Sequence, residues 1–149
     1  MKNQNIHTVY LGLGTNLGDK EAYLKEAVEE IKKRVGEVAS LSAFYATEPW
    51  GFESENSFLN AVCRVNTTLS PTEVLHTTQQ IECALGRQKK SINGQYCDRP
   101  IDIDILIYDN LHIDTPELTI PHPLMWKRDF VMIPLKEIAP DMVLPDKNL

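Results

Sequence analysis

The stretch DRPIDIDILIY, residues Asp98–Tyr108, alternates four isoleucines with other residues, a pattern typical of a strand that packs one face on a core. The opposite face carries Asp102 and Asp104, although aspartate is depleted in strands. Side chains at i and i+2 point the same way, with Cα atoms roughly 6.5–7 Å apart. The apolar character predicts a central strand, and the two aspartates predict that like charges lie side by side on it.

The segments around this strand alternate between the strand and the helix period. The periodicities predict strands over His7–Gly14, Val38–Thr47 and Phe58–Thr67 before the DRPIDIDIL strand, and helices over Lys20–Arg34 and Pro71–Leu85. The order β-α-β-β-α-β predicts an α+β domain, a ferredoxin-like split βαβ sandwich. After it we expect a short hairpin near Asp109–Asn110 and short helical turns.

Capping residues mark where the two predicted helices begin. Asp19 is a suitable N-cap for the first helix. Ser70 suits the N-cap of the second helix, Pro71 suits its first position, and Glu73 completes a capping box. Gly86 supplies the stop.

Size and composition predict a single domain over residues 1–149, and the N-terminal sequence predicts a cytoplasmic protein. Apolar residues make up 42% of the chain, charged ones 24%, and the net charge is −6. The acidic balance argues against a nucleic-acid partner, which needs an extended basic surface. We find no apolar stretch at the N-terminus long enough for a signal peptide or a membrane span.

The aspartate pair has two interpretations. Taken alone, Asp-x-Asp is typical of a solvated strand face. Cations on both sides favour a hard metal with phosphates, because Mg²⁺ takes one or two carboxylates and fills its remaining positions with water and phosphate oxygens. These cations are Arg87, Lys89, Lys90 and Arg99 upstream, and His122, Lys127 and Arg128 downstream.

The sequence lacks the glycine-rich loops with which many enzymes bind nucleotide phosphates. There is no Gly-x-x-x-x-Gly-Lys-Ser/Thr motif. Residues 12–18 have the spacing G-x-G-x-x-x-G, which differs from a dinucleotide fingerprint, and we interpret these glycines as turn geometry after a strand. Charge for phosphates would then come from side chains, with the planar fork of arginine favoured.

A second group of residues suits a flat ring. Phe58 and Asn60 share a strand face, where an aromatic would stack on a ring and an amide would read its edge. The alternative is a secondary core with the asparagine at a sheet edge. Trp50 covers such a ring or pins its loop, and Phe130 is a second stacking face or ordinary core. Gln79 and Glu82 lie at i and i+3 of the second predicted helix, and we interpret them as solvent-exposed side chains on its surface.

With these residues together, the chain resembles the 6-hydroxymethyl-7,8-dihydropterin pyrophosphokinase family from about Val9 to Pro145. The resemblance rests on several segments in one order: GLGTNLGD (Gly12–Asp19), ATEPWG (Ala46–Gly51), FLNAV (Phe58–Val62), QIECALGR (Gln80–Arg87), DRPIDIDIL (Asp98–Leu106) and TIPHPLMWKRDFVMIPLKEIAP (Thr119–Pro140). It implies transfer of the terminal diphosphate of ATP to the pterin's hydroxymethyl oxygen, with release of AMP.

The resemblance also implies roles for individual residues. Asp102 and Asp104 would hold two Mg²⁺ ions on the ATP phosphates, and Arg87 and Arg99 would approach the transferring phosphates. The implied pterin residues are Thr47, Glu48, Trp50, Phe58, Asn60 and Phe130. The implied ATP residues are Gln79, Glu82, Lys89, Ile105, Thr119, His122 and Arg128. Departures from the family pattern are Gln95-Tyr96 for an arginine-tryptophan pair, Lys89 for arginine, and Glu117 for a basic residue.

Two rival functions stay open at this point. One is a non-catalytic ferredoxin-like ligand-binding module with a solvated Asp-x-Asp. The other is a different Mg²⁺-dependent phosphotransferase or phosphohydrolase. We expect the loops Glu48–Asn56 and Arg87–Asp98 to act as lids, and the protein to be a monomer or a weak homodimer.

Overall fold

The structure, a computed structural model, describes residues 5–16, 19–47, 58–85 and 101–140. Its strands are β1 (His7–Thr15), β2 (Glu37–Leu41), β3 (Tyr45–Thr47), β4 (Phe58–Thr67), β5 (Asp102–Tyr108), β6 (Ile113–Asp114) and β7 (Thr119–Ile120). Its helices are α1 (Lys20–Arg34), α2 (Pro71–Leu85), α3 (Asp129–Ile138) and the short 3₁₀ helix η2 (Met125–Lys127).

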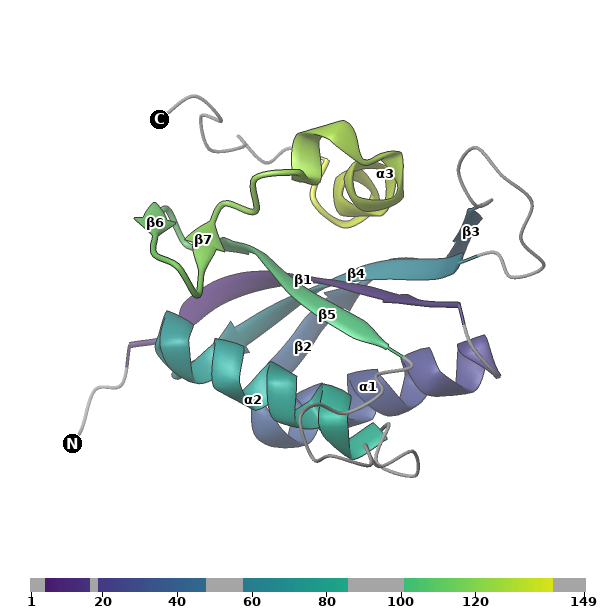
Figure 1. Cartoon of the computed structure of the whole chain (residues 1–149), viewed down its shortest axis with the longest axis horizontal. Coiled ribbons are helices and arrows are strands. Elements are labelled where there is room, and N and C mark those ends of the chain that lie inside the picture. Colours follow the sequence, from purple (N-terminus) through teal and green to yellow (C-terminus); the bar gives the residue numbers. More distant parts are fainter. Residues whose placement is uncertain (1–4, 17–18, 48–57, 86–100, 141–149) are drawn as a thin grey trace.

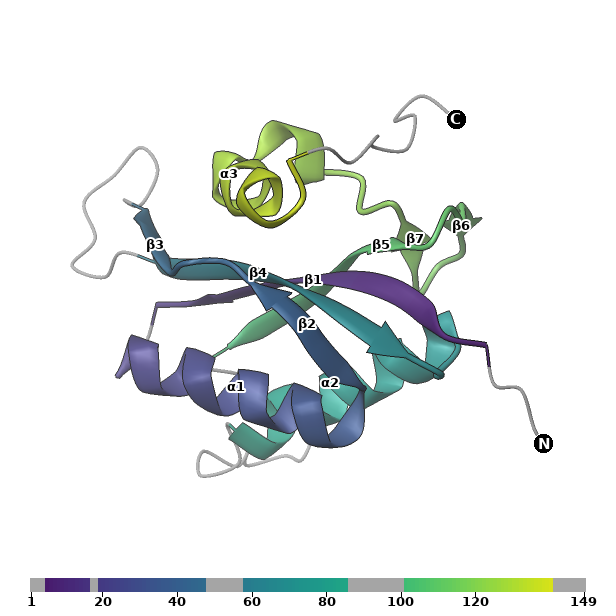
Figure 2. The same cartoon turned by 180° about the vertical axis from the view of Figure 1, so that it is seen from behind.

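One antiparallel sheet organises these elements. Its strand order is β2-β4-β1-β5, and β3 also pairs with β4. Figures 1 and 2 show α1 and α2 on one face of this sheet and α3 on the other. The order is that of a split βαβ unit, so the predicted ferredoxin-like α+β fold is confirmed.

Each face of the sheet has its own apolar core. The α1/α2 side buries Val9, Leu11 and Leu13 of β1 against Leu24 and Ile31 of α1. The α3 side holds a smaller cluster, with Tyr10, Val62, Leu106, Ile107, Met125, Val131 and Leu135. Alternation along β1 sends neighbouring residues to opposite cores, as a strand covered on both faces requires.

The predicted strand Val38–Thr47 is wrong, because the structure has two strands, β2 and β3, with a break between them. The chain advances four residues from Leu41 to Tyr45 while their partners in β4, Cys63 and Asn60, are three apart. At the break, the Ala43 N–H donates to the carboxylate of Glu137 on α3, at 3.1 and 3.2 Å to its two oxygens. The strand pairing is interrupted here because the chain between Leu41 and Tyr45 has one residue more than β4 can pair. The Ala43 N–H is also directed at α3 and not at β4.

Two expectations for the DRPIDIDIL strand are also wrong. β5 lies at the end of the strand order and not at its centre. Ile103 and Ile105 pack in the α1/α2 core, but Ile107 packs in the α3 core. The cause is a register shift, since Tyr10 pairs with Ile107 and the next residue of β1, Leu11, pairs with Ile105. The extra residue of this bulge reverses the faces to which the later residues of β5 point.

The C-terminal hairpin exists, but its turn is not at Asp109–Asn110. It is formed by β6 and β7, with Ile113 opposite Ile120, and its turn spans residues 115–118. Asp109 has a φ of 49°, in the left-handed region, and turns the chain out of β5.

Both predicted helix caps are confirmed. Asp19 accepts a hydrogen bond from the Ala22 N–H at 3.2 Å. In the capping box of α2, the Ser70 N–H donates to Glu73 Oε1 at 2.8 Å, and the Glu73 N–H donates to Ser70 Oγ at 3.2 Å. Two backbone donors that a helix start leaves without intrahelical partners are thereby satisfied.

We predict that Ser70→Ala lowers the free energy of unfolding by about 1 kcal/mol, because it removes the acceptor of the Glu73 N–H. Urea denaturation followed by circular dichroism measures this difference. Thr72→Ala, at an exposed position of the same turn, is the control and should stay within about 0.5 kcal/mol of the wild type. Equal losses in both variants would contradict the capping role.

Candidate active site

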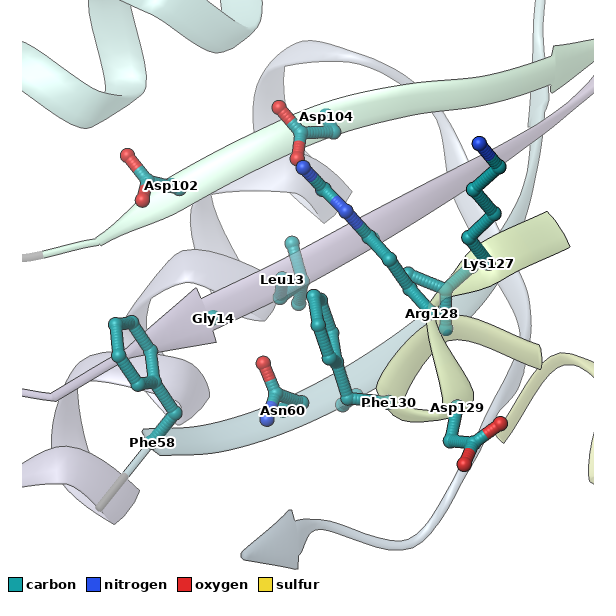
Figure 3. A pocket seen from close by; sticks show the side chains of 13 residues that line it. Leu13, Gly14, Phe58, Asn60, Asp102, Asp104, Lys127, Arg128, Asp129 and Phe130 are labelled. Carbon is teal, nitrogen blue, oxygen red and sulfur yellow. The ribbon is translucent and has the colours of Figure 1, made fainter. Parts of the chain in front are cut away.

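A pocket of about 540 Å³ lies where α3 approaches the sheet. Its volume is in the range of small-molecule sites. Figure 3 shows that its walls come from β1, β4, β5 and the η2–α3 segment. The lining residues are Gly12, Leu13, Gly14, Phe58, Asn60, Ala61, Asp102, Asp104, Lys127, Arg128, Asp129, Phe130 and Val131.

The floor of the pocket is set by strand register. Gly14 of β1 pairs with Asn60 of β4 on one side and with Asp102 of β5 on the other. One step along, Gly12 pairs with Asp104. Residues directly opposite each other in antiparallel strands present side chains on the same face. Asn60, Gly14 and Asp102 therefore form one row across three strands, with no side chain at the glycine between the two polar residues.

The two glycines correct the interpretation of residues 12–18 as turn geometry. Gly12 and Gly14 lie inside β1 and line the pocket. A Cβ atom at Gly14 would lie 2.8 Å from Asn60 Oδ1, closer than real contacts allow. The glycine is needed at this position because the asparagine side chain occupies the space beside it.

The amide and the two aromatic rings share the same pocket. Asn60 is buried, with 4% of its surface exposed, and β4 lies between β1 and β2, so the alternative of an asparagine at a sheet edge is wrong. Phe58 is 37% exposed, and Phe130 is half-buried beside the α3 core. Figure 3 shows the two rings on either side of Asn60, an arrangement suited to a flat ligand.

The charged side chains of the pocket form an acidic and a basic wall. Asp102 is exposed and Asp104 is half-buried, both on β5, while Lys127 and Arg128 come from the segment that leads into α3. In Figure 3 the Arg128 side chain extends toward Asp104. Its guanidinium carbon also lies 5.4 Å from the centre of the Phe130 ring. This pairing of carboxylates and cations suits a divalent metal that carries phosphates.

The donor set fits Mg²⁺ better than a metal held by protein alone. Among the described residues, no three His, Cys, Asp or Glu side chains come together as metal ligands. A structural zinc site needs four such ligands, whereas Mg²⁺ needs only one or two carboxylates beside water and phosphate. Asp102 and Asp104 provide that number on one face of β5.

His122 lies beyond the pocket lining but supports β5. Its backbone N–H donates to the Leu106 carbonyl at 2.9 Å, and its Nδ1 accepts from the Leu124 N–H at 3.1 Å. Burial lowers the pKa of His122 below its usual 6.5, Arg128 lowers this pKa further, and Asp104 opposes the shift. An imidazole that accepts a backbone hydrogen bond at Nδ1 is consistent with that direction.

The other predicted site residues are distributed around the pocket or lie outside the described chain. Glu82 is buried and accepts a hydrogen bond from Ile103, so surface solvation is wrong for it, whereas Gln79 is exposed. Ile105 packs in the α1/α2 core, Thr119 is on β7, and Thr47 of β3 pairs with Phe58. Outside the described residues lie Glu48, Trp50, Arg87, Lys89, Arg99 and the two expected lid loops.

Sequence reasoning missed part of the lining. Gly12, Leu13, Gly14, Ala61, Asp129 and Val131 were not expected in the site, and Lys127 was noted only as a nearby cation. Glycine at two alternate positions of β1, Gly12 and Gly14, was the available signal. The role of these glycines depends on which residues of β4 and β5 pair with them, and this pairing cannot be derived from the sequence.

Fold and pocket together define a ferredoxin-like domain whose pocket combines two carboxylates of β5, two cations, two aromatic rings and a buried amide. A family model described as 7,8-dihydro-6-hydroxymethylpterin-pyrophosphokinase (HPPK) matches residues 10–140. The chain belongs to this family. In the part of the chain that the structure describes, none of the helices has the length and apolar character needed to cross a membrane.

Curated relatives agree with this membership. The chain is 54% identical over 133 residues to a Porphyromonas gingivalis 2-amino-4-hydroxy-6-hydroxymethyldihydropteridine pyrophosphokinase, covering 89% of this chain and 90% of that protein. It is 41% identical over 138 residues to the Aquifex aeolicus protein of the same name, covering 93% and 84%.

A solved structure shares the fold. Plasmodium falciparum HPPK-DHPS, wild type with pteroate, matches with a TM-score of 0.73 and 14% sequence identity over 95% of this chain. The match spans 42% of that longer chain. At this identity the likeness supports the ferredoxin-like fold alone.

We predict that His122 titrates below pH 6.5 in the magnesium-free protein. Because its folded-state pKa is lowered, the unfolded state binds the proton first, and stability is lost as the pH falls from 6.5 toward that folded-state pKa. NMR of the imidazole resonances measures this pKa. Asp104→Asn should lower the pKa further, and Arg128→Gln should raise it. A raised His122 pKa in Asp104→Asn, or a lowered one in Arg128→Gln, would contradict the electrostatic account.

Proposed function

We propose that this protein transfers the terminal diphosphate of ATP to the hydroxymethyl oxygen of 6-hydroxymethyl-7,8-dihydropterin and releases AMP, a step of folate biosynthesis. Membership of the pyrophosphokinase family supports this reaction. The single observation that carries it is the row Asn60, Gly14 and Asp102 across β4, β1 and β5. This row brings a buried amide beside the acidic pair, an arrangement that supports a ring-binding side chain next to a phosphate-binding one.

The pterin would lie between Phe58 and Phe130 with its edge on Asn60. The amide of Asn60 offers two donors and an acceptor, which complements the alternating donors and acceptors of a pterin edge. Each aromatic stack adds about 0.5–1.5 kcal/mol beyond burial. Gly14 leaves room for the Asn60 side chain beside it, and the hydroxymethyl group would point along the row toward Asp102. In this proposal Thr47, Glu48 and Trp50 complete the pterin contacts.

The ATP phosphates would lie over β5 between the acidic and the basic wall. Asp102 and Asp104 would hold two Mg²⁺ ions, which supply positive charge to the phosphate oxygens when bound. Arg128 faces Asp104 across the pocket and would orient the phosphates, while Arg87 and Arg99 would approach the transferring group. The proposed remaining nucleotide contacts are Gln79, Lys89, Ile105, Thr119 and His122, whereas Glu82 is buried on α2 against the backbone of β5.

Positioning is then the main contribution of the protein to the reaction. The hydroxymethyl oxygen forms a bond to the β-phosphorus while the bond from this phosphorus to the bridging oxygen of AMP breaks, and the hydroxyl proton is released. In-line placement and spread-out positive charge favour this displacement more than covalent help does. We also propose that residues 1–149 act as one domain, as a monomer or weak homodimer in the cytoplasm, with the loops Glu48–Asn56 and Arg87–Asp98 as lids.

Incubation with ATP, Mg²⁺ and the reduced hydroxymethyl pterin tests this function directly. AMP should form only when the pterin is present, together with the pterin diphosphate. ADP or inorganic phosphate as the nucleotide-derived product would favour a different phosphotransferase or phosphohydrolase. No nucleotide turnover, with intact folding, would favour the non-catalytic module.

We predict that Asp102→Ala and Asp104→Ala each lower kcat by more than about 10²-fold, because each removes a carboxylate that would hold the metal. Thermal unfolding should change little, because both side chains face the pocket. Asp129→Ala, a pocket carboxylate on the opposite wall, is the matched control and should retain most activity. Activity near the wild-type level in either β5 variant would exclude that residue from the metal site.

We predict that Asn60→Ala weakens pterin binding by about 10-fold or more while ATP binding changes less, because a ring edge would lose its hydrogen bonds. Gly14→Ala should have the same selectivity, since its Cβ would displace the Asn60 side chain. Gly12→Ala is the control, because its Cβ would meet Leu106 at 3.4 Å and not Asn60. Calorimetry with each ligand measures both affinities, and equal losses for pterin and ATP would remove Asn60 from this role.

A further inference from the structure

Among the residues that the structure describes, Glu82 is the one buried acidic or basic side chain. It projects from α2 with 5% of its surface exposed. Its Oε2 accepts a hydrogen bond from the backbone N–H of Ile103 at 2.7 Å. A carboxyl group in an apolar environment is unfavourable unless it is hydrogen-bonded, so this contact contributes to the compensation for its burial.

The Ile103 amide lies on the outer edge of the sheet. β5 ends the strand order and, among the described strands of the sheet, pairs with β1 alone. Strand N–H groups lie in the sheet plane and alternate between its two sides, so an N–H that is donated to α2 points away from β1. Glu82 thus takes the place that a further strand would have at this point of the edge.

The bond controls the part of β5 that carries the acidic pair. The Ile103 N–H belongs to the peptide group that joins Asp102 to Ile103, and this group is planar. Holding it fixes the rotation of the strand between Asp102 and Asp104. Ile103 then faces the α1/α2 core, and both carboxylates face the pocket on the other side.

A second contact holds the same edge farther along. The His122 N–H donates to the Leu106 carbonyl at 2.9 Å, so the second half of β5 is supported by the segment after β7. The first half, where the acidic pair lies, is supported by Glu82 on α2. The end of a strand that is hydrogen-bonded to a neighbouring strand on one side only opens easily. The Glu82–Ile103 bond is therefore important for the part of β5 that carries the two carboxylates.

We propose that Glu82 is a positioning residue, which holds the Ile103 amide at the open edge of β5 and so sets the direction of Asp102 and Asp104 before any metal binds. This role rests on the proposed function, because it concerns the geometry of the metal-binding pair. It differs from direct contact with the nucleotide, since Glu82 acts through the backbone of β5.

The test compares Glu82→Gln, which keeps an oxygen acceptor, with Glu82→Leu, which removes it. Amide hydrogen exchange in the metal-free protein reports on Ile103, and Mn²⁺ titration with α,β-methylene-ATP reports on the metal site. Glu82→Leu should lower Ile103 protection and weaken Mn²⁺ binding by about 10–100-fold, as loss of a group that orients a metal ligand does. Glu82→Gln should keep Ile103 protection and Mn²⁺ affinity within about threefold of the wild type, because glutamine retains an oxygen acceptor.

Asp109→Asn is the matched control at the other end of β5. The Asp109 carboxylate accepts the Thr8 N–H at 2.8 Å, and asparagine tolerates its left-handed φ of 49°. The control should leave Ile103 exchange and Mn²⁺ affinity unchanged. Wild-type Mn²⁺ affinity in Glu82→Leu, or lost affinity in Glu82→Gln with Ile103 still protected, overturns the proposal.

Two further outcomes have a defined interpretation. If Glu82→Leu does not fold, Glu82→Gln decides alone, by retained Ile103 protection together with retained Mn²⁺ affinity. AMP formation by the wild type is measured separately. Its absence would reject the proposed function, while the exchange and Mn²⁺ results would still accept or reject the positioning role.

Discussion

The register of β1 between β4 and β5 is the constraint on which the site depends. It places Gly14 between Asn60 and Asp102, and it places Gly12 beside Asp104. Each of the three strands supplies one part of the pocket: β4 an amide, β1 two glycines without side chains, and β5 the carboxylates. A slip of one residue in either ladder would send its polar side chain to the apolar α1/α2 core, so the two cores on opposite faces maintain the register that the chemistry needs.

The helices give this sheet two unlike faces. α1 and α2 bury the first face in apolar residues, and α2 also contributes Glu82 to the edge of β5. α3 covers only part of the second face and brings Phe130 to the rim of the space that remains. The Ala43–Glu137 bond joins α3 to the break between β2 and β3, next to the strand residues that pair with Asn60 and Phe58. Packing and polar contacts thus position Phe58 and Phe130 on two sides of the pocket.

Local patterns predicted the elements better than their positions. The capping box at Ser70 and the N-cap at Asp19 depend on neighbours in the chain, and both are confirmed. The place of β5 in the sheet, the face of Ile107 and the burial of Glu82 depend on partners far away in the chain, and the sequence interpretation of all three was wrong. Alternation shows that a strand has two faces, but not what lies against each.

The sequence by itself determined the order of strands and helices, the family, and the pairing of Asp102 with Asp104 on one side of a strand, because periodicity and motifs are local properties. Only the tertiary structure decided that Gly12 and Gly14 form the floor of the pocket. It also decided that Asn60 is buried beside them and that a helix carboxylate holds the Ile103 amide. These features arise from strand register and helix packing, which join distant parts of the chain and leave no periodic signal in it.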